Sequence, residues 1–259
     1  MSEEHRPLLG NVSVQEYASI ADQYESTFQV LPYRTYVEQA SVLNVIGDVT
    51  GLRVLDVACG TGYYSRLWRQ RGASQVVGVD ISPEMVQAAQ KIEAASPLGL
   101  TYLVRDVGTM EVLGTFDLVV GVYRLHYATT GEHLDQMCQC IAANLVSGGR
   151  FVTDTVNPAA ARQPGYYEPY GMALYAHDDM VDGTEYSFAF TTTQGMISPL
   201  TIHYWTIARL EQALTKAGFT DICWQPAVVS AEGIRELGQE YWARHEAAPF
   251  CIILSATRL

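Results

Sequence analysis

The chain has 259 residues, of which 48% are hydrophobic and 17% are charged, and its formal net charge at pH 7 is −12. This length and composition predict a globular chain with one large core, and they exclude disordered and fibrous proteins. A chain this acidic, without a cluster of basic residues, would repel a phosphate backbone. We therefore expect no nucleic-acid partner. No apolar run approaches the ~20 residues that span a bilayer, and no signal peptide is visible. The five cysteines are scattered, and we therefore expect a cytoplasmic protein with reduced thiols and no membrane contact.

Helices are expected first along the chain. Apolar and aromatic residues recur at helical spacing over 14–30, and a second helix over 33–47 ends at Gly47. From 52 to 155, short apolar strands alternate with helices, which predicts a parallel sheet covered on both faces. The expected strands are 53–58, 75–80, 101–106, 116–123 and 150–156, and the expected helices are 63–71, 83–95 and 132–145.

The alternation stops after Asn157-Pro158. Residues 158–182 are rich in proline, glycine, tyrosine and aspartate and indicate a loop or lid. The remaining expected elements are antiparallel strands at 184–193 and 197–205, helices at 206–217 and 231–246, and strands at 219–229 and 250–257 that extend the main sheet as an antiparallel pair.

We therefore expect one Rossmann-like α/β domain over 1–259, with a seven-stranded, mostly parallel sheet and an antiparallel lid inserted after the fifth strand. Its expected parts are an N-terminal helical cap (1–50), a cofactor-binding core (51–156), a lid that contacts substrate (157–206) and the C-terminal part of the sheet (207–259).

The stretch VLDVACGTG at 54–62 places Gly60 and Gly62 between a buried strand and a helix. Glycines there allow a tight turn and a close approach of a ligand to main-chain N–H groups. Asp80 ends the next strand, where a carboxylate can accept hydrogen bonds from both hydroxyls of a ribose. A dinucleotide fingerprint would need a third glycine at Ser65, which favours a cofactor other than a pyrophosphate dinucleotide.

Two more carboxylates belong to this pattern. Asp56 lies in the first strand, where it can balance a methionine amine or a sulfonium, and Asp106 ends the third strand, where it can accept a hydrogen bond from an adenine amino group. Three carboxylates at successive strand ends suit a cationic cofactor better than a pyrophosphate. The pattern favours S-adenosylmethionine (SAM) over a nicotinamide cofactor.

The segments DVACGTG (56–62), GVDIS (78–82), RDV (105–107), FDLV (116–119) and LVSGG (145–149) resemble, in order and spacing, the motifs of class I SAM-dependent methyltransferases. The resemblance implies SAM as the cofactor and S-adenosylhomocysteine (SAH) as its product. It also implies that Asp80 and Ile81 hold the adenosine and that Asp106 and Val107 flank the adenine. The loop under the methionine moiety is then formed by Ala58, Cys59, Gly60, Thr61 and Gly62. The family often has glycine where this chain has Ala58.

Flanking segments such as YASIADQYESTFQVLPYRTYVE, YRLHYA and VNPAAARQPGYYEPYG look like the subgroup that contains the toxoflavin-pathway and bacterial indole or pyrroloindole methyltransferases. This resemblance implies methyl transfer to a nitrogen or carbon of a small heteroaromatic metabolite in bacterial secondary metabolism. In related enzymes the first helix caps the SAM pocket and its tyrosines bond the methionine carboxylate. Tyr17 and Tyr24 lie on one face of that helix, and they either take this role or pack in the core.

Tyr123 and His126 follow the fourth strand, at the sheet edge where ligands bind in open α/β folds. We expect Tyr123 to border the methyl-transfer site. His126 is the first candidate for a general base, with Tyr24 as its partner, because an imidazole titrates near neutral pH. The alternative for His126 is packing beneath the next helix.

Candidate substrate contacts are Asp154 and Asn157, near the end of the fifth strand, and Tyr170 and His203 in the aromatic-rich lid. The first pair either positions a substrate N–H or caps a turn, and the lid aromatics either stack a flat acceptor or form their own small core. No set of residues has metal-ligand spacing. We expect a small-molecule partner and leave the oligomeric state open, a homodimer included. The alternative functions are an NAD-dependent oxidoreductase and a non-catalytic SAM-binding protein.

Overall fold

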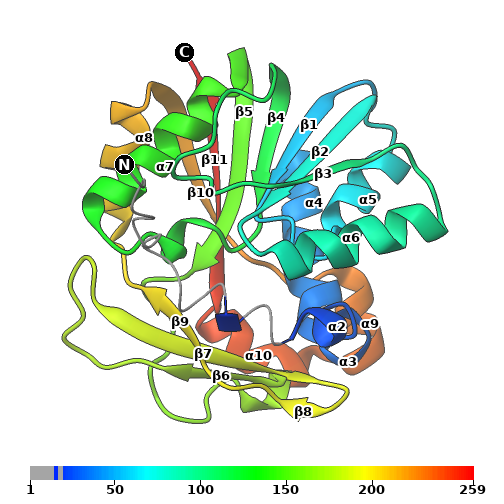
Figure 1. Cartoon of the computed structure of the whole chain (residues 1–259). Coiled ribbons are helices and arrows are strands. Elements are labelled where there is room, and N and C mark those ends of the chain that lie inside the picture. Colours follow the sequence, from blue (N-terminus) through cyan, green and yellow to red (C-terminus); the bar gives the residue numbers. More distant parts are fainter. Residues whose placement is uncertain (1–14, 17–19) are drawn as a thin grey trace, which may run out of the picture.

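The computed structural model describes residues 15–16 and 20–259 (Figure 1). Its main sheet has seven strands in the order β10-β11-β5-β4-β1-β2-β3, and only β11 runs against its neighbours. The strands are β1 (Arg53–Val57), β2 (Gln75–Asp80), β3 (Thr101–Val104), β4 (Phe116–Gly121), β5 (Leu145–Val156), β10 (Phe219–Pro226) and β11 (Cys251–Arg258). The predicted Rossmann-like, mostly parallel sheet is confirmed.

Helices cover both faces of this sheet because its strands are apolar on both sides. Along β1, Val54 packs in one hydrophobic cluster with residues of α4 (Ala40–Ile46), α5 (Tyr63–Gln70) and α6 (Pro83–Ala95). The next residue, Leu55, packs in a second cluster with α7 (Gly131–Ala143) and α8 (Ile207–Lys216). This two-residue alternation is what a strand buried on both faces requires. The predicted N-cap of α6 is also present, since the backbone N–H of Met85 donates to the Ser82 hydroxyl at 3.3 Å.

The helix expected over 14–30 is not continuous, although residues 15–16 and most of 21–30 are helical. Two short helices, α2 (Ala21–Tyr24) and α3 (Thr27–Val30), take its place. The hydroxyls of Ser26 and Thr27 donate to the carbonyl oxygens of Gln23 and Tyr24, each at 2.6 Å, and such side-chain bonds compete with a continuous helix. The second expected helix begins with a π-helical segment, η1 (Arg34–Gln39), and continues as α4 up to Gly47.

The lid is more regular than expected. The segment predicted as a loop contains β6 (Met172–Tyr175), which pairs with β7 (Glu185–Thr192), and β7 also pairs with β8 (Gly195–Met196) and β9 (Leu200–His203). Figure 1 shows this antiparallel sheet beyond the carboxyl ends of the main strands, beside α2 and α3. The predicted insertion is therefore present, with two strands, β6 and β8, more than the pattern indicated.

The C-terminal helix expected over 231–246 is divided at Gly238, which has φ 82° and ψ 153°. Its halves are α9 (Ala231–Leu237) and α10 (Gln239–Ala247). Two single turns of 3₁₀-helix, η2 (Leu125–Tyr127) and η3 (Glu168–Tyr170), complete the described elements. Within the ranges described, no helix combines the length and the apolar character that crossing a membrane requires.

Candidate functional site

The loop between β1 and α5 has left-handed backbone at Ala58 (φ 59°), Gly60 (φ 55°) and Gly62 (φ 81°). Glycine adopts this region freely, whereas alanine does so at a cost. A side chain at position 62 would also overlap the Tyr102 hydroxyl, because that ring lies directly beneath the loop. Glycine at 62 therefore serves both the turn and the packing below it.

Asp80 holds this loop to the end of β2. Its Oδ2 accepts a hydrogen bond from the N–H of Gly60 and its Oδ1 accepts one from the N–H of Ser82, both at 2.9 Å. Burial raises the pKa of Asp80, and these N–H donors oppose that rise. Each carboxyl oxygen still has a second lone pair, so Asp80 can accept hydrogen bonds from ligand hydroxyls.

The other two carboxylates of the sequence pattern, Asp56 and Asp106, bond residues outside the loop between β1 and α5. Asp56 is 2% exposed and accepts a hydrogen bond from the Ser65 hydroxyl at 2.5 Å. Burial raises its pKa to about 7. Asp106 accepts a hydrogen bond from the N–H of Gly108 at 2.9 Å, and one of its carboxyl oxygens lies 3.6 Å from Nη2 of Arg124.

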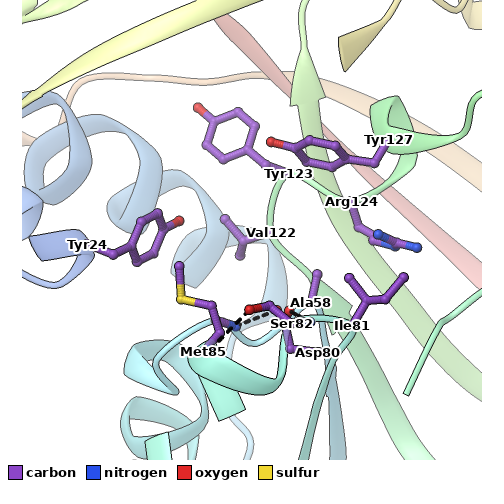
Figure 2. Close-up of a pocket in the computed structure, with 11 residues that line it drawn as sticks. Tyr24, Ala58, Asp80, Ile81, Ser82, Met85, Val122, Tyr123, Arg124 and Tyr127 are labelled. Atoms are coloured by element: carbon purple, nitrogen blue, oxygen red, sulfur yellow. Dashed lines mark hydrogen bonds between the residues drawn. The ribbon is translucent and has the colours of Figure 1, made fainter. Parts of the chain in front are cut away.

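A first cavity of about 540 Å³ opens above the loop (Figure 2). The sequence-predicted residues that line it are Tyr24, Ala58, Gly60, Asp80, Ile81 and Tyr123. Sequence reasoning missed its other lining residues, Ser82, Met85, Val122, Arg124 and Tyr127. In Figure 2, Tyr24 enters from the N-terminal helices, and Asp80, Ile81 and Ser82 lie across the cavity from Tyr123.

Several predicted cofactor contacts are not among these lining residues: Asp56, Cys59, Thr61, Gly62, Asp106 and Val107. Cys59 and Thr61 are buried within the loop, and Val107 packs in the second hydrophobic cluster. Tyr17 lies outside the described residues. The loop thus presents Ala58 and Gly60 to the cavity, and the residues between and behind them shape its backbone.

A second cavity of about 370 Å³ lies between the N-terminal helices, β11 and the lid. It is lined by Tyr24, Leu31, Tyr33, Arg34, Glu38, Tyr123, Met172, Phe188, Phe190 and Phe250. Tyr24 and Tyr123 line both cavities, so the two spaces adjoin at these two residues. The lid contributes Met172 from β6 and Phe188 and Phe190 from β7.

One ion pair interrupts the apolar wall of the second cavity. The side chains of Arg34 and Glu38 are 8% and 2% exposed, and Nη2 of Arg34 lies 3.1 Å from Oε1 of Glu38. Arg34 also donates to the Thr27 hydroxyl at 2.7 Å and to the Tyr24 hydroxyl at 3.4 Å. Burial raises the pKa of Tyr24 and the charge of Arg34 lowers it. Sequence reasoning missed this pair, because an arginine and a glutamate four residues apart on a helix usually form a surface pair.

Asp154 supports Tyr123 from within the core. The N–H of Tyr123 donates to Oδ1 of Asp154 at 2.6 Å, and this bond accompanies a left-handed φ of 55° at Tyr123. Oδ2 of Asp154 has no hydrogen-bond partner in the described part of the chain. Burial, followed by the charge of Glu38, holds the pKa of Asp154 well above its usual range. Both causes favour the protonated form of this carboxyl group.

The other predicted catalytic and substrate residues do not line either cavity. His126 is 2% exposed, its Nδ1 lies 3.3 Å from the Thr155 hydroxyl, and burial lowers its pKa to about 3. Asn157 bonds the Pro249 carbonyl and the Ala159 N–H, both at 3.0 Å, and so holds a turn. The Tyr170 hydroxyl donates to the Tyr241 carbonyl at 3.0 Å and holds α10. Burial lowers the pKa of His203, on β9.

Residues 54–149 match the family described as the methyltransferase domain. Among curated proteins, the chain is 40% identical over 72 residues to a malonyl-[acyl-carrier protein] O-methyltransferase of Hamiltonella defensa, covering 28% of this chain and 26% of that protein. It is 34% identical over 117 residues to a ubiquinone biosynthesis O-methyltransferase of Xanthomonas oryzae, covering 44% and 47%. The matched segments thus span between about a quarter and a half of these relatives.

Solved structures match over more of the chain. A SAM-dependent methyltransferase from Mesorhizobium loti aligns with a TM-score of 0.63 and 25% identity over 85% of this chain and 97% of its own. A complex of DhpI with SAH aligns with a TM-score of 0.61 and 16% identity over 98% of both chains. The [4+2]-cyclase SpnF also aligns, with a TM-score of 0.55 and 19% identity over 84% of this chain and 79% of its own. The last two likenesses concern the fold alone.

Proposed function

We propose, from the confirmed resemblance of this chain to class I SAM-dependent methyltransferases, that it transfers a methyl group from SAM to a small acceptor. The proposed acceptor atom is a nitrogen or carbon of a heteroaromatic metabolite. The observation that carries the proposal is the pair of cavities that share Tyr24 and Tyr123 as lining residues. One cavity has the polar groups that a nucleoside needs, and the other has the aromatic wall that suits a flat acceptor.

The first cavity fits SAM by the chemistry of its walls. Asp80 offers acceptor oxygens to the ribose hydroxyls, and Ile81 and Met85 offer apolar contact to the adenine. The left-handed turn at Ala58 and Gly60 brings main-chain atoms close to the methionine part of the cofactor. When bound, SAM would supply a methyl group on a positively charged sulfur, and aromatic rings such as those of Tyr24 and Tyr123, which line the cavity, favour a nearby cation.

The residues around the junction act by orientation and by exclusion of water. Tyr24 is held by Arg34, and Tyr123 is held by Asp154, so both rings have defined positions. Fixing two reactants in one geometry is a large source of rate enhancement. A general base is needed only if the acceptor must lose a proton to react. We keep His126, with Tyr24 as its partner, as the base proposed from the sequence; its ring lies 5.7 Å from that of Tyr123, centroid to centroid.

Two measurements test the proposal. Calorimetry with SAM and with SAH is expected to give binding to the wild-type chain, and Asp80→Ala is expected to weaken it by at least tenfold because the ribose loses a charged hydrogen-bond acceptor. Transfer of a labelled methyl group from SAM to a panel of small heteroaromatic compounds then tests catalysis. Absence of heat with both SAM and SAH, in a folded protein, would refute the proposal.

The alignment with SpnF favours one second candidate, a SAM-binding protein that does not transfer methyl groups, because SpnF is a [4+2]-cyclase with this fold. Binding of SAM without label transfer to any compound of the panel is the outcome expected from that candidate. The aromatic second cavity, which borders the first at Tyr24 and Tyr123, argues against this candidate, since a protein that only binds SAM has no need of an acceptor space.

A further inference from the structure

Glu38 presents one anchored and one open carboxyl oxygen at the second cavity. Its Oε1 accepts hydrogen bonds from Nε and Nη2 of Arg34 at 3.2 and 3.1 Å and from the Tyr64 hydroxyl at 2.9 Å. Over residues 15–16 and 20–259, no donor bonds its Oε2. The carboxylate is therefore fixed by three donors on one side and keeps its other oxygen for a ligand.

The surroundings of Glu38 make an unused acceptor costly. The residue is 2% exposed, and a carboxylate oxygen in so buried a side chain has less access to the hydrogen bonds that bulk water would give it. The remaining wall is apolar or aromatic, with Leu31, Phe188 and Phe190 among its members. The Tyr33 hydroxyl is already engaged, because it donates to Sγ of Cys251 at 2.9 Å. A ligand in this cavity therefore meets one carboxylate acceptor among mostly apolar and aromatic side chains, with the phenol groups of Tyr24 and Tyr123 beside it.

From this arrangement we infer that Oε2 of Glu38 is the specificity-determining contact for the acceptor and binds an N–H group of a flat, uncharged ring. The inference rests on the proposed function, since it assigns the second cavity to the methyl acceptor. Arg34 already balances the charge of Glu38, so the pair as a whole is neutral and does not favour an ammonium ion. A carboxylate ligand would meet Glu38 as a like charge, with Arg34 already paired.

The test compares two probes that differ at the N–H group alone, benzimidazole and 1-methylbenzimidazole. Each is titrated by calorimetry into the chain saturated with SAH. We expect the wild type to bind benzimidazole at least tenfold more tightly, because a hydrogen bond to a buried carboxylate is worth about that factor. In Glu38→Gln, which offers a donor or a weaker acceptor, this preference is expected to disappear, while the affinity for SAH stays within twofold of wild type.

Controls separate this contact from a loss of structure. Glu111→Gln makes the same chemical change at an exposed glutamate that also pairs with an arginine, Arg105, and it is expected to keep the wild-type preference. Glu38→Asp keeps the charge and shortens the side chain, and it is expected to lower the preference at least threefold. If Glu38→Gln does not fold, Glu38→Asp alone tests whether Glu38 sets the preference for benzimidazole.

Three results would overturn the inference: equal binding or no binding of the two probes by the wild type, a preference that survives in both Glu38 variants, or a loss of SAH affinity in Glu38→Gln, which would place Glu38 at the cofactor. A wild-type chain that does not bind SAH would instead refute the proposed function. The probes are then titrated without SAH, so that the role of Glu38 is decided separately.

Discussion

Asp56 is the residue for which the structure makes the sharpest prediction about pH. Its carboxyl group is buried beneath the loop, and burial is the largest cause of a pKa raised from 3.8 to about 7. The hydrogen bond from Ser65 and the charge of Arg66 lower the pKa, and the charge of Asp80 raises it further. The folded chain therefore holds a proton at Asp56 over a pH range in which the unfolded chain has lost it.

The sign of the effect follows from this difference. A group whose pKa is higher in the folded state contributes stability that is fully present below the unfolded pKa and is lost as the pH rises through the folded one. For Asp56 this loss extends from about pH 4 to about pH 7. Each unit of pKa difference corresponds to about 1.4 kcal/mol, so the total is on the order of 4 kcal/mol.

Asp56→Asn removes this titration and keeps the shape of the side chain. We measure the unfolding free energy of both proteins with urea between pH 4 and pH 8. The difference between the variant and the wild type is expected to shift in favour of the variant by up to about 4 kcal/mol as the pH rises. Asp80 and Asp154 also have raised pKa values, but they are present in both proteins and largely cancel in the comparison. Parallel curves for the two proteins would show that Asp56 does not hold this proton.

Two further predictions concern the loop and the proposed base. Gly62→Ala is expected to lower the unfolding free energy by about 2–4 kcal/mol, from about 1 kcal/mol of backbone strain and the displacement of the Tyr102 ring. Gly99→Ala is the control, because Gly99 has the same φ of 81° and open space around it. Only the backbone strain of about 1 kcal/mol applies there. Equal losses of unfolding free energy in the two variants would show that the contact with Tyr102 does not contribute. For His126, a pKa of about 3 keeps the ring neutral from pH 5 to 8. The rate of single-turnover methyl transfer is therefore expected to show no inflection near pH 6.5 that depends on His126, so the pH profiles of the wild type and of His126→Ala have the same shape in this range. A rate unchanged in His126→Ala would remove this residue from the mechanism.

The main sheet was predictable because its signals are local. Each strand from β1 to β4 is a short, largely apolar segment, and caps and glycines mark the neighbouring helices, as Ser82 does for α6 and Gly47 does for α4. The errors came where tertiary contacts compete with local patterns. Ser26 and Thr27 divide the expected first helix by bonding the backbone. The strand β6 lies in a segment whose composition indicates a loop, and it is stabilised by pairing with β7.

The site residues were likewise predictable only where the sequence carries a local signal. Asp80 and Ile81 were found because they follow a strand at a fixed distance from the glycine loop, and they line the first cavity. The second cavity brings together Arg34 from η1, Phe188 from the lid and Phe250 next to β11, and no spacing in the sequence relates these positions. Lid aromatics that the composition emphasised, such as Tyr170, hold α10 instead.

The meeting of the two cavities also explains why a strained residue occurs beside them. Tyr123 has a left-handed φ of 55°, which costs an aromatic residue on the order of 1–2 kcal/mol. The backbone conformation is compensated by the short bond from its N–H to Asp154, a residue buried on β5. Strain of this kind persists where the surrounding structure determines it, and it is common at functional sites. Because Tyr123 lines both cavities and Asp154 lines neither, a change at Asp154 is expected to alter the boundary between the two cavities through the backbone of Tyr123.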